Sequence, residues 1–290
     1  MTTRSAKNHI KTLKEEYDRL KIDKDSLLRI IEEAEIPEMV YNSNAIENST
    51  LTLRETEKIL LEMEVSKDVS LREVFETKNL ARIIEYIRVK LPKPELTKEN
   101  ILLFHQMLMG NIADDIAGRF RAEGEYVRVG SHIAPAPEHI EKRIGDMFIE
   151  YSSDQISYFL DKIAKFHLEF EIIHPFNDGN GRMGRVLINL QLQQLGFPGI
   201  IIRNKEKKDY YECFNAYRDV KGTKQMEKIL SLSLSESLYK RIAYLRGETI
   251  IPVSEYAKKI DKRGSVLLNA AKRQTVPAFR EKGVWKIGFR

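Results

Sequence analysis

Residues 174–185 read HPFNDGNGRMGR, and this stretch decides the fold. The apolar pair at 172–173 is typical of a helix end, and Pro175 would enforce that end because proline cannot continue the helical hydrogen bonds. Two glycines then lead into a second helix with polar groups in its first turn. Backbone N–H groups at a helix N-terminus attract anions, and glycines allow a phosphate to approach closely. The stretch therefore predicts a helix, a glycine-rich loop and a second helix that presents an anion site.

The side chains of this stretch predict phosphate chemistry. Arg182 and Arg185 are three residues apart, so they share a helix face and can hold successive phosphates. Asp178 is a hard oxygen ligand of the kind that suits Mg²⁺. His174 can act as a base near neutral pH. Together they could support in-line attack by a hydroxyl on a Mg²⁺-bound phosphate.

Most of the remaining chain has helical periodicity, so the fold class is predicted to be mainly α. Thr52 and Glu55 form a capping box, and Thr97 can cap the helix that follows it. Residues 118–136 contain glycines, prolines and an alternating segment, which predict a short β-hairpin or flap. The predicted helices cover residues 71–90, 97–109, 137–151, 154–172, 181–195, 207–219 and 224–246.

The stretch at 174–185 resembles the Fic family signature, HPF-x-[DE]-GNGR-x-x-R, at every defined position. Similarity extends from about Tyr41 to Leu245. The resemblance implies a Fic/Fido helical core with a hairpin flap and an N-terminal helical regulatory region. It also implies a nucleotidyltransferase that moves AMP from ATP to Ser, Thr or Tyr hydroxyls of a target protein. ATP would be its substrate and Mg²⁺ its cofactor.

The resemblance assigns a role to each matching position. His174 would be the general base, and Asp178 would hold Mg²⁺ on the α- and β-phosphates. Arg182 would contact the β-phosphate and Arg185 the γ-phosphate. The remaining expected nucleotide contacts are Gly130, Ser131, Gly179, Asn180, Gly181, Met183, Gly184, Tyr210 and Tyr211. The tyrosine pair would border the adenine, although an asparagine found in some relatives is here Arg218. The target protein would dock on the flap at 127–137.

An upstream segment, residues 43–48, reads SNAIEN and resembles the inhibitory motif of the family, [ST]-x-x-x-E-[GN]. Its defined positions are Ser43, Glu47 and Asn48. The resemblance implies that Glu47 pairs with Arg185 and occupies the γ-phosphate position, so that ATP would be poorly aligned.

Composition limits the alternatives. Cys213 is the only cysteine among 290 residues, which excludes a disulfide within the chain. The sequence has no secretory signal and no apolar run of about 18 residues, so we expect a cytoplasmic protein with no membrane contact. The net charge is +5, and residues 252–290 hold ten Lys or Arg against three Asp or Glu. We expect three regions: an N-terminal helical region (1–95), a catalytic domain (96–247) and a C-terminal module (252–290).

The C-terminal module resembles a small winged helix-turn-helix of the excisionase or MerR-like type. Ser254 would cap its first helix, a second helix would cover about 264–273, and the wing would be a hairpin over 277–287 that turns at 282–283. Basic residues that could meet DNA phosphates are Lys272, Arg273, Arg280, Lys282 and Lys286. A protein-docking or oligomerising module, and with it a homodimer, is the alternative.

Other functions remain open at this level. The same site could remove AMP from modified targets or act as a phosphotransferase of the Doc type. A DNA-binding regulator whose core senses nucleotide is a further alternative. Neither the target protein nor a DNA sequence is identified.

Overall fold

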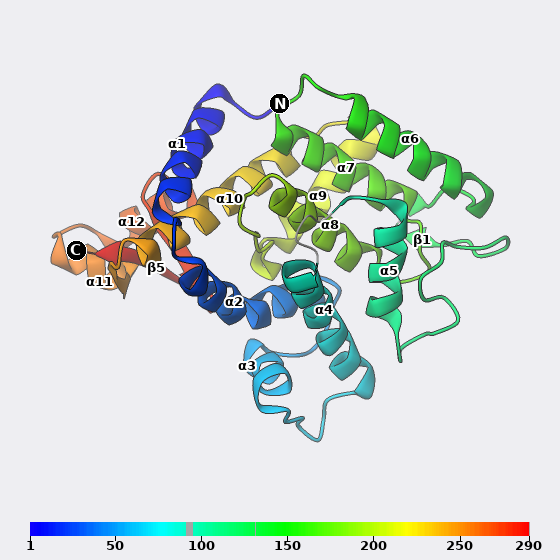
Figure 1. Ribbon diagram of the computed structural model, residues 1–290, viewed down its shortest axis with the longest axis horizontal. Helices are drawn as coiled ribbons and strands as arrows, with labels where there is room; N and C mark the ends of the chain where they lie inside the picture. Colours follow the sequence, from blue (N-terminus) through cyan, green and yellow to red (C-terminus); the bar gives the residue numbers. More distant parts are fainter. Residues whose placement is uncertain (91–94, 131, 290) are drawn as a thin grey trace.

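The computed structural model describes residues 1–90, 95–130 and 132–289, and it is mainly helical, as predicted (Figure 1). The helices are α1 (Arg4–Leu20), α2 (Asp25–Ile46), α3 (Leu53–Glu57), α4 (Leu71–Lys90), α5 (Lys98–Met109), α6 (Ile140–Ser153), α7 (Phe159–Ile173), α8 (Asn180–Gln194), α9 (Lys207–Val220), α10 (Lys224–Leu245), α11 (Val253–Lys259) and α12 (Gly264–Lys272). The strands are β1 (Arg128–Val129), β2 (His132–Ile133), β3 (Thr249–Pro252), β4 (Ala278–Glu281) and β5 (Val284–Phe289). Short turns of other helix types are η1 (Lys58–Glu62), η2 (Pro137–His139) and η3 (Asn204–Glu206).

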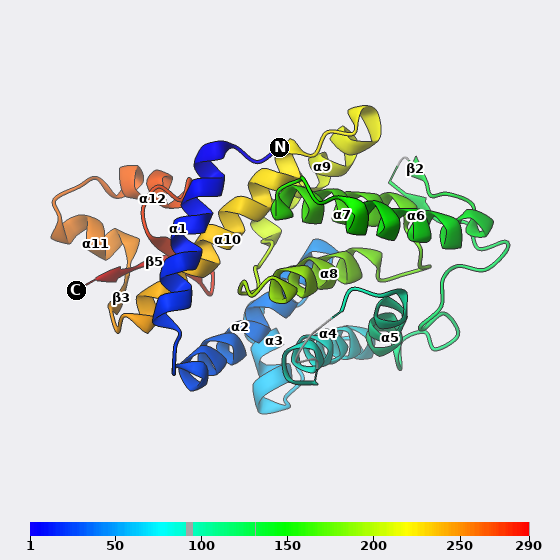
Figure 2. The same cartoon turned by 45° about the horizontal axis from the view of Figure 1, so that its top comes forward.

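Helices α7 and α8 form the centre of the molecule. In Figure 2, α8 lies between α7 on one side and α4 and α5 on the other. One apolar core joins α7 and α8 to α1, α9 and α10, and a second joins them to α4, α5 and α6. The loop between α7 and α8 is therefore held from both sides by buried side chains.

Local sequence signals explain most of the helix ends. Thr52 and Glu55 form the predicted capping box, and Thr97 accepts a hydrogen bond from the backbone N–H of Asn100. The predicted helix over 154–172 starts later, at Phe159, because Asp154 accepts backbone N–H groups of Ile156 and Ser157 in a turn. Hydrogen bonds from backbone N–H groups to such a side chain compete with helix formation.

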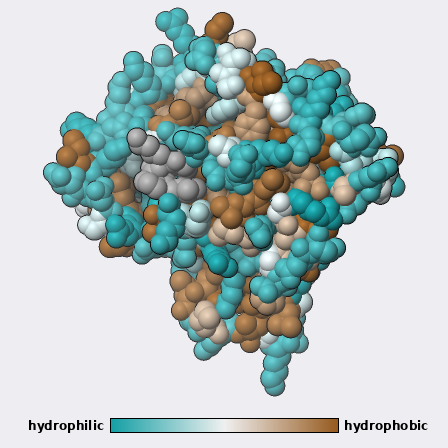
Figure 3. Space-filling model, turned by 45° about the vertical axis from the view of Figure 1, so that its right-hand side comes forward, coloured by the Kyte–Doolittle hydropathy of each residue, from teal (hydrophilic) through white to brown (hydrophobic). Residues whose placement is uncertain are grey.

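The outer surface is mostly hydrophilic on the face shown in Figure 3. The lobe at the bottom of that view contains α3 and the segment that leads into α4, and it carries apolar patches. Leu61, Met63 and Leu71 are exposed there. In the described ranges, no helix combines the length and the apolar character that crossing a bilayer requires.

The C-terminal module is a three-stranded antiparallel sheet in the order β3-β5-β4 with α11 and α12 packed on it. The predicted hairpin is present and turns at Lys282 and Gly283, whose φ angles of +50° and +77° suit a tight two-residue turn. The prediction that Ser254 caps the first helix is wrong. Helix α11 begins at Val253, so Ser254 already lies in its first turn. Strand β3 begins at Thr249, before the expected module boundary.

The hairpin of this module docks onto the helical body. Arg280 is only 11% exposed, and its guanidinium lies 2.7 Å from Glu236 of α10. The backbone N–H groups of Lys282 and Gly283 each donate to the carboxylate of Glu38 on α2, at 3.1 Å. Of the basic residues expected to meet DNA, Arg280 is thus occupied by acidic partners inside the protein.

The other expected phosphate contacts divide into two groups. Lys282 pairs with Glu57 and Lys286 pairs with Glu281. Lys272 and Arg273, at the end of α12, are exposed to solvent. In this arrangement the free basic surface lies at α12 rather than on the wing.

Candidate active site

Helix α7 delivers His174 to the site. The backbone N–H of His174 still bonds to Phe170, but its φ of +49° turns the chain out of the helix, and Pro175 prevents continuation. Arg121 fixes this corner. Its Nε donates to the carbonyl of His174 at 2.9 Å, and its other nitrogens donate to Glu125 and Pro135 at 2.8 Å. The base of the flap and the end of α7 are therefore tied through one buried guanidinium.

The side chain of His174 is 16% exposed. Burial lowers its pKa to about 4, although the backbone carbonyl of Glu171 acts in the opposite direction. The imidazole is therefore neutral at pH 7, the form that accepts a proton.

The loop between the two helices is held by its own residues. The Asn180 amide accepts from the backbone N–H of Phe176 at 2.9 Å and donates to its carbonyl at 2.8 Å. Asn180 therefore shapes the loop rather than offering its side chain to a phosphate. Gly179 has φ +82°, and a Cβ there would collide with Leu108. Only glycine fits this position without strain.

A carboxylate lies over the start of α8. A Cβ built on Gly181 would collide with Oε1 of Glu47, so the carboxylate rests directly against this first turn. The first N–H groups of a helix have no partner within the helix and carry partial positive charge. Glu47 thus occupies a position that suits a phosphate group.

Arg185 completes this contact, and the predicted pair with Glu47 is present. Its Nη2 lies 2.8 Å from Oε1 of Glu47 and also donates to the carbonyl of Ser43 at 2.8 Å. Its Nε donates to the hydroxyl of Ser43 at 2.9 Å. Asn48 lies next to this contact and accepts from Lys207 at 2.7 Å. Arg185 is buried, which by itself would lower its pKa, but Glu47 together with Tyr210 and Glu171 raises the pKa above its ordinary value.

Asp178 is surrounded by arginines. Arg72 of α4 pairs with one carboxylate oxygen, and Arg182 lies 3.1 Å from the other. Glu76 bridges the two arginines, at 3.0 Å from Arg182 and 3.1 Å from Arg72. Burial would raise the pKa of Asp178, but the two arginines hold it below its ordinary value. Asp178 is therefore an anion in a strongly cationic setting.

Asp178 suits a metal ion that is also bound by a substrate and by water. No group of three or more His, Cys, Asp or Glu side chains in the part of the chain that the structure describes could hold a metal by itself. Mg²⁺ is usually bound by one or two carboxylates together with substrate phosphates and water. Asp178 fits that arrangement.

A cleft of about 460 Å³ brings together His174, Asp178, Glu47 and the start of α8, while Arg185 does not line it. Its walls come from the end of α2, the start of α4, the flap and the 174–182 loop. Val127 and Arg128 of the flap line it together with His174. Gly130 lies at the hairpin turn with φ +59°, and Ser131 lies outside the described residues. The chemistry predicted from one short stretch is thus assembled from four separate parts of the chain.

Three expected nucleotide contacts lie elsewhere. Met183 is fully buried in the core. Gly184 faces α7, where a Cβ would collide with His167 and Glu171. Tyr210 is buried behind Arg185, and its hydroxyl lies 2.8 Å from Nε2 of His167. These three residues pack behind the site instead of lining it.

Tyr211 occupies a different position from Tyr210. Its hydroxyl donates to the carbonyl of Ile46 at 2.9 Å, and its ring is 38% exposed. Lys207 lies over the same ring at 5.5 Å. Tyr211 therefore borders the end of α2 and is exposed to solvent.

The sequence profile of the Fic/DOC family matches residues 95–192, which contain the flap, His174 and the start of α8. The chain therefore contains a domain similar to those of the Fic/DOC family. Over 180 residues it is 34% identical to protein adenylyltransferase Fic of Nematostella vectensis, a match that covers 61% of this chain and 42% of that protein. Protein adenylyltransferase fic-1 of Caenorhabditis elegans is 31% identical over 178 residues, covering 59% of this chain and 34% of that protein. The chain thus spans less than half the length of these curated relatives.

Solved structures show the same fold. A Fic domain containing signaling protein from Bacteroides thetaiotaomicron has a TM-score of 0.75 and 25% identity, covering 83% of this chain and 98% of that chain. A Fic family protein from Desulfovibrio desulfuricans G20 covers 99% of this chain and 97% of its own, with a TM-score of 0.68 and 19% identity. The second likeness concerns the fold alone.

Sequence reasoning missed three side chains of this site: Arg72, Arg121 and Glu171. Arg72 and Arg121 are far from the motif in sequence, and no local pattern marks them. Glu171 is different, because its carboxylate lies 4.0 Å from Nδ1 of His174 inside an otherwise apolar helix face. An acidic residue in the apolar run before the motif was a signal that could have found it.

Proposed function

We propose that this Fic protein transfers AMP from ATP to a hydroxyl side chain of a target protein, and that Glu47 restrains it. The observation that carries this proposal is the position of the Glu47 carboxylate. It lies on the first turn of α8 and bonds Arg185, within the same cleft as His174. A carboxylate that occupies a site suited to a phosphate would compete with the substrate for that site.

The reaction needs a base, an electrophile and a leaving group. His174 takes the proton of the attacking hydroxyl through its neutral ring. The hydroxyl oxygen forms a bond to the α-phosphorus of ATP, the bond between the α-phosphorus and the bridging oxygen breaks, and pyrophosphate leaves with that electron pair. The amides at the start of α8 and the guanidinium of Arg182 stabilise the charge on the phosphates.

Asp178 would hold the Mg²⁺ that accompanies ATP, and the ion would neutralise charge on the phosphate oxygens. Asp178 now pairs with Arg72 and Arg182. Entry of the nucleotide would let both arginines turn from the carboxylate to phosphate oxygens. Nucleotide binding would therefore replace the ion pairs between Asp178 and the two arginines with ion pairs between the arginines and the phosphates.

Restraint follows from competition for Arg185. The guanidinium uses Nε and Nη2 on Ser43 and Glu47, and burial leaves it little room to turn. A γ-phosphate placed there would meet the negative charge of Glu47 at close range. ATP could then enter only with its phosphates displaced from the line of attack.

The target would approach along the flap. Strands β1 and β2 form a sheet of only two strands, so each retains an unpaired edge. An extended peptide can add to such an edge through main-chain hydrogen bonds. Pairing over 127–137 would place a hydroxyl side chain beside His174.

Incubation with ATP labelled at the α- or the γ-phosphate tests the proposal. Transfer of AMP labels protein from α-labelled ATP and leaves it unlabelled from γ-labelled ATP. Labelling from the γ-position would identify a phosphotransferase instead. Release of label from a protein that already carries AMP would support the removal reaction.

A further inference from the structure

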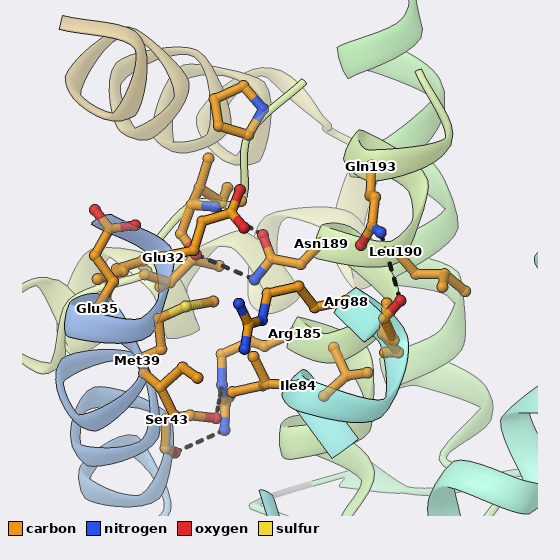
Figure 4. A pocket seen from close by; sticks show the side chains of 18 of the residues that line it. Glu32, Glu35, Met39, Ser43, Ile84, Arg88, Arg185, Asn189, Leu190 and Gln193 are labelled. Carbon is orange, nitrogen blue, oxygen red and sulfur yellow. Dashed lines mark hydrogen bonds between the residues drawn. The ribbon is translucent and has the colours of Figure 1, made fainter. Parts of the chain in front are cut away.

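A second cavity, of about 240 Å³, lies behind the inhibitory helix α2 (Figure 4). It is bounded by α2, α4, α8 and residues 197–202, and it is separate from the catalytic cleft. Its apolar walls include Met39, Ile84, Leu190 and Ile200. An engineered apolar cavity of about 150 Å³ is known to hold benzene, so this space can accept one ring with a short chain.

The charges that line this cavity are almost all satisfied. Arg88 pairs with Glu33 at 3.1 Å, and Arg241 pairs with Glu35 at 2.7 Å. Glu35 has a second partner, Lys240, at 3.1 Å. Arg185 has its partners in Ser43 and Glu47, as described above. Each of these groups thus has at least one partner, although one nitrogen of each of the three arginines is buried without a partner.

Glu32 is the exception. Among the described residues, its carboxylate has no ion pair within 4 Å and no hydrogen bond, although it lines the cavity. Burial raises its pKa, while Arg241 and Arg88 act in the opposite direction. Asn189 cannot serve it readily, because its amide bonds the backbone of Ile200 from both ends. The cavity therefore combines apolar walls with one carboxylate that has no partner.

We propose that this cavity binds a small apolar amine, whose ammonium group pairs with Glu32 and whose hydrocarbon body fills the space between α2 and α8. The Glu32 carboxylate is partly buried and has no partner, and a bound cation would offset the cost of that burial. A carboxylate ligand would add a like charge next to Glu32. The unpartnered Nε atoms of Arg88 and Arg241 are covered by protein atoms and do not open to the cavity.

Occupancy of this site is linked to the inhibitory contact. Ser43 and Arg185 line the cavity, and Figure 4 shows the bonds between them at its edge. The cavity exists only while α2 packs against α8. A ligand that binds one arrangement of two stabilises it. The amine therefore reinforces the restraint by Glu47. This consequence rests on the proposed function, whereas the binding site does not.

Calorimetry with the full chain and phenethylamine at pH 7.5 tests the site, with 3-phenylpropionate as a control of similar shape and opposite charge. We expect saturable binding of the amine and binding of the carboxylate at least about tenfold weaker, which corresponds to about 1.4 kcal/mol. Glu32→Gln keeps the shape and should reduce this preference below about threefold. Ile84→Trp should fill the cavity and abolish binding, with circular dichroism confirming that the variant is folded. Absence of saturable binding, or equal binding of the two probes, would overturn the site.

The regulatory link has its own measurement. Saturating phenethylamine should lower the initial rate of labelling from α-labelled ATP in the wild type and leave Glu32→Gln unaffected. Binding without any change in that rate would overturn the link and keep the site. If no variant of the protein transfers label at all, the proposed function fails, while calorimetry still decides the binding site.

Discussion

The backbone N–H of Gly283 lies 3.1 Å from Oε1 of Glu38, which joins the turn of the C-terminal hairpin to the inhibitory helix. The two residues are 245 positions apart. Glu38 lies on α2, on the approach to Ser43 and Glu47. A movement of the hairpin would therefore act on α2, the helix that carries Ser43.

Glu38→Gln should weaken the hold of the hairpin on α2, because it weakens two hydrogen bonds from the turn and breaks the buried pair of Glu38 with Arg203. A hydrogen bond contributes about 0.5–1.5 kcal/mol, so we expect AMP transfer to rise at least about threefold. Removal of residues 249–290 should act in the same direction. Initial rates of labelling from α-labelled ATP measure both. Lys282→Ala serves as the control, since it removes an exposed pair with Glu57 and keeps both backbone donors. Unchanged rates in Glu38→Gln and in the truncated protein would contradict this link.

Glu47→Gly should increase AMP transfer about ten- to hundredfold. The substitution removes a charge-assisted bond to Arg185, and such bonds contribute about 1.5–3 kcal/mol. It also removes a negative charge from the place where the γ-phosphate would lie. Labelling rates at saturating ATP provide the measurement. Adding Arg185→Ala should abolish the gain, and a gain that survives this second change would show that Arg185 is not the group that Glu47 blocks.

His174→Ala in the Glu47→Gly background should lower transfer by about 10²–10⁴, the usual contribution of a general base. ATP affinity should change little, because the phosphate contacts come from α8 and from Asp178. Equilibrium binding and single-turnover labelling separate the two effects. Full labelling by the variant would exclude His174 as the base.

Arg121→Ala should destabilise the fold by about 3 kcal/mol or more, since it leaves several buried carbonyls without donors. It should also lower kcat more than it raises KM, because the backbone of His174 loses its support. Urea unfolding and steady-state kinetics are the measurements. Arg121→Lys keeps the charge but not the fork of donors, so it should restore only part of the loss. Wild-type stability in Arg121→Ala would refute this role.

Glu171→Gln should remove a pH dependence of stability. Burial, and next the charge of Glu47, raises the pKa of Glu171 from 4.5 to about 8. The folded protein therefore keeps a proton that the unfolded chain releases above pH 4.5. The stability from this protonated carboxyl is complete below pH 4.5 and is lost as the pH rises towards 8, by at most about 1.4 kcal/mol per unit.

Thermal unfolding between pH 6.5 and 8.5 checks this expectation. Histidines of the unfolded chain still titrate at the lower end of this window, but they do so equally in both proteins, so the difference between the two curves reports on Glu171. The wild-type melting temperature should fall with pH relative to that of Glu171→Gln. Parallel curves for the two proteins would mean that Glu171 is already ionised at neutral pH.

Much of the fold could be predicted from short-range signals. The helix at 71–90 and the helix after Thr97 have the expected bounds, because an apolar stripe and a capping side chain lie within the segments themselves. The turn at Lys282 and Gly283 was likewise visible as a local pattern. The start of α7 was not, because a turn around Asp154 took residues that had helical periodicity.

The candidate site shows the same division. His174, Asp178, Gly181 and Arg182 were named from the motif and line one cleft, and the pair between Glu47 and Arg185 is formed. Met183, Gly184 and Tyr210 belong to the same local patterns, but packing turns them away from the cleft. A motif specifies which residues lie close together in sequence, whereas packing against the neighbouring helices decides which way they point. Docking of a target on the flap, binding of DNA and formation of a homodimer stay predictions.

The sequence by itself determined the helix–loop–helix that carries His174, because proline and a positive-φ glycine act on their immediate neighbours. Only the tertiary structure decided that Arg72 lies on Asp178 across 106 residues and that Arg121 holds His174 across 53. It also decided that the hairpin turn donates hydrogen bonds to Glu38 and that a cavity lined by the unpaired carboxylate of Glu32 lies behind α2. These relationships depend on how helices distant in sequence pack together, and no local periodicity encodes which faces will meet.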